Sequence, residues 1–246
     1  MPLREEMISQ GNFLFKYRSF LPILILLAGL YVYVRHKLFS PNDDEFTWEL
    51  ICLSVCLVGL FIRIYCIGYS HDNTSGRNTE EGQIAEAINQ SGLYATCRHP
   101  LYLGNFLMWL GIALLTLNGW FVIAFIFLFW VYYERIMFAE EEYLRNKFGK
   151  VYTDWAEKTP AFIPDLTKWT PPRLSFSWKK VIRQEKAGIL NLFLVFWLFK
   201  AIAAYSINGT ILIENTFWQF GLLAAIAWYI LIKGLQMTTV LFEKDR

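Results

Sequence analysis

Six apolar runs, each bounded by charged or turn residues, dominate the pattern of hydrophobic positions along the chain. They lie at about 19–35, 46–69, 101–117, 119–138, 189–207 and 217–236. Each approaches the ~20 residues that a helix needs to cross the ~30 Å apolar core of a bilayer. Leu117, Asn118 and Gly119 leave room only for a tight turn between the third and fourth runs, which predicts a helical hairpin. The pattern therefore predicts an all-α integral membrane protein with about six transmembrane helices.

The composition agrees with this class. Of the 246 residues, 55% are hydrophobic and 18% are charged, whereas about 25% are charged in a typical soluble domain. A soluble single domain is disfavoured, and a disordered, collagen-like or disulfide-stabilised secreted protein is excluded. No small-residue cleavage site follows the first apolar run, so we expect this run to remain as an anchor.

Lysine and arginine residues gather on one side of the predicted membrane. The segment 139–188 carries ten of them, whereas the opposite side has little beyond Arg35 and Lys37. Because positive residues mark the cytoplasmic side, we expect both termini, the 70–100 loop and the 139–188 segment in the cytoplasm. In a bacterium this membrane would be the inner membrane.

Four parts are expected along the chain. They are two transmembrane helices at 1–69, a core of loop, hairpin and closing segment at 70–166, a basic interfacial linker at 167–188, and two further helices at 189–246. In the linker, Trp178 beside Lys179 and Lys180 is expected to lie in the headgroup layer. Lys200 is costly inside the fifth run and is expected to pair with Glu214 or to reach the interface.

Metal and nucleic acid are not expected as ligands. His36, His71 and His99 never stand at metal-ligand spacing, and the motifs of zinc hydrolases and P-loop enzymes are absent. Cys52 and Cys56 share a helix face, which favours lipid or helix contact over a metal site. The basic residues lie beside the membrane, so nucleic acid is disfavoured as well.

The polar loop between the second and third runs carries signals for two helix starts. Asn78 and Glu81 resemble a capping box, which predicts a short helix that Gly92 would end. Pro100 suits the first turn of a helix, so we expect the third transmembrane helix to begin there.

A helix that begins at Pro100 would offer an anion site at its start. The N–H groups without helical partners would be those of Leu101, Tyr102 and Leu103. With the positive end of the helix dipole they would face the cytoplasm beside Arg98 and His99. Gly104 would let another group approach closely. The alternative is that Arg98 and His99 are ordinary residues flanking the membrane.

Three consecutive acids, Glu140, Glu141 and Glu142, close the fourth run. They lie on the same side of the membrane as Arg98, at the ends of one hairpin. A carboxylate pair there could hold a cation near the anion site, so that one pocket would accept a ligand with both carboxylate and ammonium groups. The alternative is a solvated face that follows the membrane exit.

Two strings carry a resemblance to a known family. GLYATCRHPLYLGN at 92–105 and EEEYLRNKFGKVYTDWAEKTPAFIP at 140–164 resemble the isoprenylcysteine carboxyl methyltransferase superfamily, which includes phospholipid N-methyltransferases. QGNFLFKYRSFLP at 10–22, GRNT at 76–79 and AEKTPAFIP at 156–164 look closest to a bacterial branch assigned to lipid A 1-phosphate O-methylation.

The resemblance implies S-adenosylmethionine as methyl donor, bound in a cytoplasm-facing pocket that the segment 148–164 would close over the adenine. The residues it places at the cofactor are His99, Pro100, Leu101, Tyr102, Gly104, Glu140, Glu141 and Tyr152. Arg98, with Arg77 or Arg63, would bind the acceptor anion, since the guanidinium fork can hold both oxygens. Alternatively, Arg63 only extends to the interface.

The expected function is methyl transfer to an anionic oxygen of a membrane-embedded amphiphile, either a lipid or a lipidated substrate. A lipid phosphate ranks ahead of a prenylcysteine carboxylate, and an amine headgroup is a further alternative. An ionised oxygen needs no strong base, so positioning and water exclusion would dominate catalysis. An NADPH-dependent sterol-type reductase is disfavoured by the acidic tail motif. A transport protein is disfavoured because the polar motifs gather on one side and no internal repeat is visible.

Overall fold

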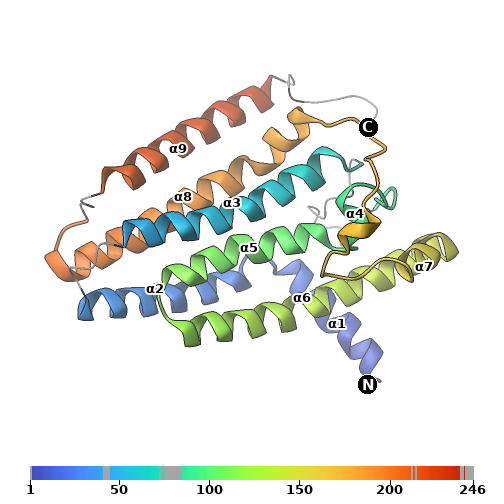
Figure 1. Ribbon diagram of the computed structural model, residues 1–246, viewed down its shortest axis with the longest axis horizontal. Helices are drawn as coiled ribbons and strands as arrows, with labels where there is room; N and C mark the ends of the chain where they lie inside the picture. Colours follow the sequence, from blue (N-terminus) through green and yellow to red (C-terminus); the bar gives the residue numbers. More distant parts are fainter. Residues whose placement is uncertain are drawn as a thin grey trace.

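The computed structural model describes residues 2–40, 45–71, 74, 85–211, 213, 215–238 and 241, and within them the chain forms helices and no β-strand. The α-helices are α1 Leu3–Lys16, α2 Leu21–Phe39, α3 Phe46–Gly68, α4 Leu93–Thr96, α5 Pro100–Leu115, α6 Gly119–Phe148, α7 Lys150–Ala156, α8 Trp178–Asn208 and α9 Thr216–Met237. A 3₁₀ turn covers Leu166–Lys168. α1, α4 and α7 lie toward one end of the long-helix bundle, which we call the site end (Figure 1).

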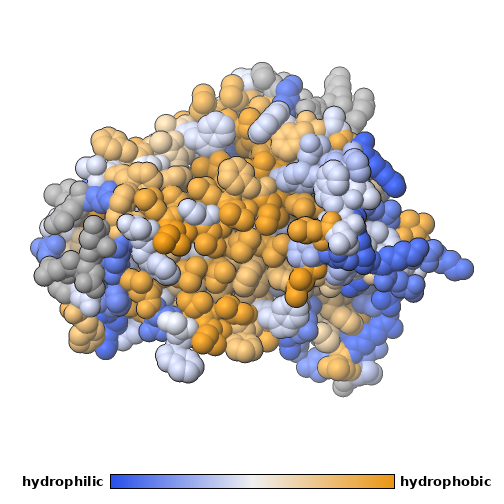
Figure 2. Space-filling model, in the orientation of Figure 1, coloured by the Kyte–Doolittle hydropathy of each residue, from blue (hydrophilic) through white to orange (hydrophobic). Residues whose placement is uncertain are grey.

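The long helices confirm an all-α integral membrane protein. Five of them, α2, α3, α6, α8 and α9, are long and apolar enough to cross a membrane. With 16 residues, α5 is shorter and spans about 24 Å at 1.5 Å per residue. Apolar side chains form a broad band across the middle of the surface, with polar residues toward both ends (Figure 2).

Small residues bring α3 and α5 into close contact. A Cβ atom added at Gly104 would lie 2.8 Å from the carbonyl oxygen of Gly59, so the two backbones approach as only glycines permit. Cys56 donates its thiol hydrogen to the carbonyl oxygen of Met108 on α5, 3.1 Å away. The cysteine face of α3 therefore makes helix contact.

The short amphipathic helix α1 was not expected from the sequence. It packs along α6, where Gly11 lies against the backbone of Arg135. Arg135 also donates from Nε to Oε1 of Gln10 at 2.8 Å, and Arg4 forms an ion pair with Glu142. The sequence of α1 mixes polar and apolar residues and therefore gave no signal for a transmembrane helix.

The α8–α9 hairpin is held to α3 by a buried charge cluster. Lys200 of α8 forms an ion pair with Glu49 of α3, and Trp218 of α9 donates its indole N–H to the same carboxylate at 2.6 Å. The partner of Lys200 in the structure is therefore Glu49, whereas the sequence predicted Glu214, which lies outside the described residues. Two donors offset part of the cost of burying the carboxylate.

Two segments differ from the local predictions. The linker 167–188 is helical from Trp178 onward. Lys180, expected in the headgroup layer, is instead buried, and its ammonium donates to the carbonyl oxygens of Ser70 and His71 at 2.9 and 2.8 Å. The short helix expected before Gly92 does not cover 85–91, which is irregular. Its proposed cap at residues 78–81 lies outside the described residues.

Candidate functional site

A cavity of about 400 Å³ opens at the site end, between the two motif segments. Arg63 of α3, Tyr102 of α5, Glu140 of α6 and Trp155 of α7 line it, and Arg18 lines it from the junction of α1 and α2. The cavity is therefore assembled from helix ends that are distant in sequence.

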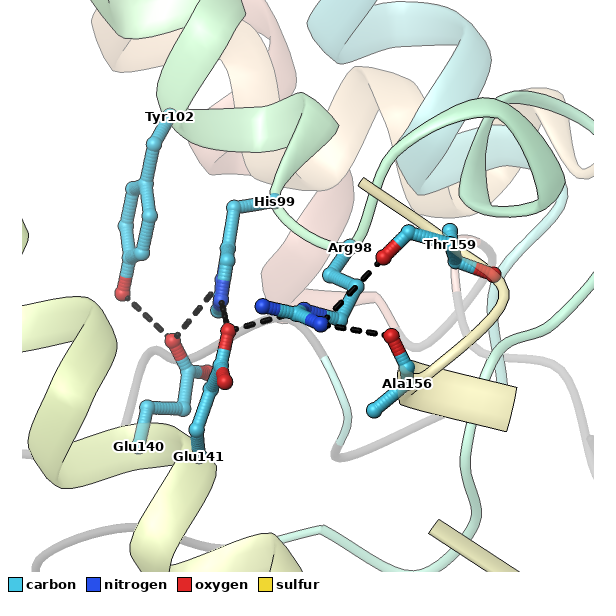
Figure 3. A network of polar contacts seen from close by, with 7 residues as sticks. All are labelled: Arg98, His99, Tyr102, Glu140, Glu141, Ala156 and Thr159. Atoms are coloured by element: carbon cyan, nitrogen blue, oxygen red, sulfur yellow. Dashed lines mark hydrogen bonds and ion pairs between the residues drawn. The ribbon is translucent and has the colours of Figure 1, made fainter. Parts of the chain in front are cut away.

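Arg98 joins both motif segments (Figure 3). Its Nε donates to Oε1 of Glu141 at 2.9 Å. Its Nη1 donates to the carbonyl oxygens of Ala156 and Thr159 at 2.7 and 3.2 Å. The guanidinium therefore fixes the end of α7 against α6, which is a use of its donors that the sequence did not predict.

His99 lies between two of the consecutive acids (Figure 3). Its Nε2 is 2.9 Å from Oε1 of Glu141, and its Nδ1 is 3.7 Å from Oε2 of Glu140. The ring stacks on Tyr102, whose hydroxyl donates to Oε2 of Glu140 at 2.9 Å. These contacts hold the Glu140 side chain at the cavity wall.

The backbone of the closing segment is tied to the start of α5. The N–H groups of Arg98 and His99 donate to the carbonyl oxygens of Pro160 and Ala161, at 2.8 and 3.1 Å. The segment after α7 therefore lies across the motif and forms one wall of the site.

The expected anion site of free amides is wrong in part. The N–H groups of Tyr102 and Leu103 donate to the carbonyl oxygen of His99, at 3.1 and 3.3 Å. Because this carbonyl satisfies two of the three expected donors, anion binding at the start of α5 would rely on the Leu101 N–H and on side chains.

The three acids point in different directions, as successive residues on a helix do. Glu140 lines the cavity, while Glu141 lies against Arg98 and His99. Glu142 is buried toward α1 and binds Arg4. The three neighbouring acids therefore have different surroundings: Glu140 faces the cavity, Glu141 joins the two motif segments, and Glu142 packs against α1.

The structure brings several of the expected cofactor residues to the cavity. Those that line it are His99, Leu101, Tyr102 and Glu140, and the expected acceptor ligands Arg98 and Arg63 line it too. Pro100, Glu141 and Tyr152 are not among the described residues that line it, and Gly104 faces Arg63 and α3. Arg77 lies outside the described residues.

Buried groups near the site keep their protons. Burial raises the pKa of the Cys97 thiol to about 11. Burial and the nearby Glu141 carboxylate raise the pKa of the Tyr152 phenol. Neither group is therefore charged at neutral pH.

Sequence reasoning missed a polar chain below the motif. Arg63 of α3 binds Glu185 of α8 and Asn105 of α5, and Asn105 donates to the hydroxyl of Tyr133 on α6 at 3.2 Å. Gln184 lines the cavity beside them. The one available signal was the isolated acid Glu185 in a basic segment, which local reasoning could not assign to a partner 122 positions away.

Comparison with known proteins matches the phospholipid methyltransferase family model to residues 49–151. The protein-S-isoprenylcysteine O-methyltransferase of Tribolium castaneum is 28% identical over 51% of this chain and 45% of its own length. That of Saccharomyces cerevisiae is 30% identical over 58% of this chain and 59% of its own. The nickel-cobalt-cadmium resistance protein NccN of Alcaligenes xylosoxydans xylosoxydans is 30% identical over 52% of this chain and 56% of its own.

The chain spans about half the length of these curated relatives. No solved structure matches it significantly. The family match runs from α3 to the start of α7, so it contains the whole of the first motif segment and the beginning of the second. The matched part of the chain is therefore similar to the superfamily of isoprenylcysteine carboxyl methyltransferases and phospholipid methyltransferases, and the comparisons support that superfamily.

Proposed function

We propose that this protein transfers a methyl group from S-adenosylmethionine to an anionic oxygen of a membrane-embedded amphiphile. The observation that carries the proposal is the cavity of about 400 Å³ that both motif segments border at the site end of an apolar bundle. Its volume falls within the range of about 300–1,000 Å³ that is usual for small-ligand sites. Because basic residues mark the cytoplasmic side and most of them are predicted on the side of the two motif segments, the site end would face the cytoplasm.

The residues at the cavity suit the methyl donor. Glu140 offers a carboxylate to an ammonium group or to ribose hydroxyls, and His99 and Tyr102 hold it in place. The indole Nε1 of Trp155 is buried at the cavity and has no hydrogen-bond partner among the described residues. A buried donor without a partner is costly, so this group would be satisfied by a ligand.

The donor, when bound, supplies an electrophilic methyl group on a sulfonium. The residues of this chain bind, orient and exclude water, because an ionised acceptor oxygen needs no proton removed. Arg98 braces the closing segment through Ala156 and Thr159 and remains a candidate ligand of the acceptor anion. Arg63, which lines the cavity, and Arg77 are the other candidates, Arg77 on the sequence resemblance alone.

A carboxylate of the isoprenylcysteine type is now the favoured acceptor. Curated relatives are named protein-S-isoprenylcysteine O-methyltransferases, and the comparisons give no support to the lipid A phosphate that ranked first on sequence. An apolar hollow of about 50 Å³, lined by Ile25 and Phe129 among others, adjoins the cavity at Tyr133. It offers an apolar tail a place beside the polar site.

The test is to locate the transferred methyl group. Purified protein would be incubated with isotopically labelled methyl donor and, separately, N-acetyl-S-farnesylcysteine, phosphatidic acid and phosphatidylethanolamine, followed by mass spectrometry. We expect label on the farnesylcysteine carboxylate. Label on phosphatidic acid alone would keep the oxyanion mechanism and restore the phosphate as acceptor. Label on the amine headgroup alone would contradict the proposal.

A further inference from the structure

We infer that α8, which lies outside the family match, completes the acceptor end of the cavity. In this arrangement Glu185 of α8 orients the guanidinium of Arg63, and Arg63 receives the acceptor oxyanion. The inference rests on the proposed methyl transfer and adds which side chains meet the acceptor.

The contacts around Arg63 fix the plane of its guanidinium. Nε and Nη2 donate to the two carboxylate oxygens of Glu185, at 3.2 and 2.6 Å, in a two-point pairing. Nη1 donates to Oδ1 of Asn105, which in turn donates to the Tyr133 hydroxyl. Four helices, α8, α3, α5 and α6, thus meet in one polar chain at the cavity wall.

Arg63 keeps hydrogen-bonding capacity for a ligand. A guanidinium carries five N–H donors, and these contacts use three, which leaves two for the cavity that Arg63 lines. The side chain of Arg63 is 21% exposed and that of Glu185 is 2% exposed. The arginine can therefore reach a ligand, whereas the glutamate acts through the arginine.

This polar chain lies deeper in the bundle than the residues around His99. Arg63 is five residues before the end of α3, and Asn105 is five residues after the start of α5. At 1.5 Å per residue, each lies about 7–8 Å inside its helix end. An amphiphile that enters from the bilayer meets this inner level, while a soluble cofactor meets the outer level of Arg98 and His99.

The glycine of the motif supports the same assignment. A Cβ atom at Gly104 would lie 2.6 Å from Cγ of Arg63. Gly104 therefore gives the Arg63 side chain its path across α5, which explains the glycine without a contact to the cofactor.

The pairing also suits turnover. Arg63 and Glu185 together carry no net charge, so the acceptor oxyanion is held by directed hydrogen bonds instead of a strong net attraction. Methylation removes the negative charge of the acceptor oxygen. The ester then keeps only weak hydrogen bonds to the pair, which favours its release.

The experiment compares Arg63→Lys and Glu185→Gln with Glu49→Gln in the full-length protein. Glu49 is the matched control, because it also joins α3 to α8 through a buried ion pair, with Lys200, away from the cavity. Methyl transfer to N-acetyl-S-farnesylcysteine gives KM and kcat for the acceptor, calorimetry gives the Kd of S-adenosylmethionine, and thermal unfolding gives stability.

We expect Arg63→Lys and Glu185→Gln to raise the acceptor KM about 10–100-fold, the range for lost charged hydrogen bonds, with donor Kd within about twofold. Glu49→Gln should lower the unfolding temperature and leave the acceptor KM unchanged. Equal KM changes at Glu185 and Glu49, or an unchanged KM in Arg63→Lys, would overturn the inference alone. A wild-type protein that methylates none of the acceptors would overturn the proposed function, and the inference with it.

Discussion

Replacing Glu140 by glutamine tests the cofactor site at the acid that faces the cavity among the residues that the structure describes. Glutamine keeps the size of the side chain and can still accept the hydroxyl hydrogen of Tyr102, which now lies 2.9 Å from the carboxylate. The change therefore removes charge with little effect on packing. If the carboxylate holds an ammonium group or ribose hydroxyls of the donor, the substitution removes a hydrogen bond to a charged group.

The expected loss is about 1–3 kcal/mol of binding free energy, the scale for a hydrogen bond that involves a charge. This corresponds to a Kd for S-adenosylmethionine that is about 5–150 times weaker. The side chain of Glu140 is 25% exposed, so solvent screening favours the lower half of this range. Isothermal titration calorimetry on protein in detergent measures the change directly.

Glu142→Gln is the internal control, because Glu142 is buried toward α1 and binds Arg4. We expect less than about a twofold change in donor Kd, together with a small loss of stability. Glu141→Gln should fall between the two, since Glu141 acts through Arg98 and His99. Equal and negligible effects at all three positions would refute the assignment and support a solvated acidic face.

Three further predictions concern the frame of the site. A lysine at position 98 cannot bind Glu141 and the Ala156 carbonyl at the same time. In Arg98→Lys we therefore expect kcat to fall by a larger factor than the affinity for the methyl donor, which steady-state kinetics and calorimetry would measure. Lys200→Met leaves Glu49 buried without its cation and should cost about 3–5 kcal/mol in thermal unfolding, and an unchanged melting temperature would contradict the pairing. Cys97 should react slowly with maleimide at pH 7–9, because the thiolate forms only as pH rises through its raised pKa of about 11, and rapid labelling of the native protein would refute this burial.

The helices were largely predictable because their signals are local. A run of about 20 apolar residues is visible without any knowledge of its neighbours. Pro100 marks the start of α5 as expected, because a missing N–H costs nothing in a first turn. The two motif strings could be placed near one another for the same reason, since the hairpin of α5 and α6 brings its two ends to one side.

Contacts between distant helices were not predictable. The pairing of Glu49 with Lys200 spans 151 positions and that of Arg63 with Glu185 spans 122, and no periodicity reports such a partner. The prediction of an anion site made of free amides was wrong in part for a different reason. The sequence shows that Pro100 begins a helix, but it does not show that the carbonyl of His99 turns back to accept two of the amides.

Titration of the purified wild-type protein with S-adenosylmethionine and, separately, with NADPH tests the central claim most directly. The claim is that the cavity between Glu140, Tyr102 and Trp155 is the methyl-donor site of a membrane methyltransferase. Calorimetry should give saturable binding of S-adenosylmethionine in the micromolar range and no heat of binding with NADPH. Saturable binding of NADPH with no heat from S-adenosylmethionine would contradict the account.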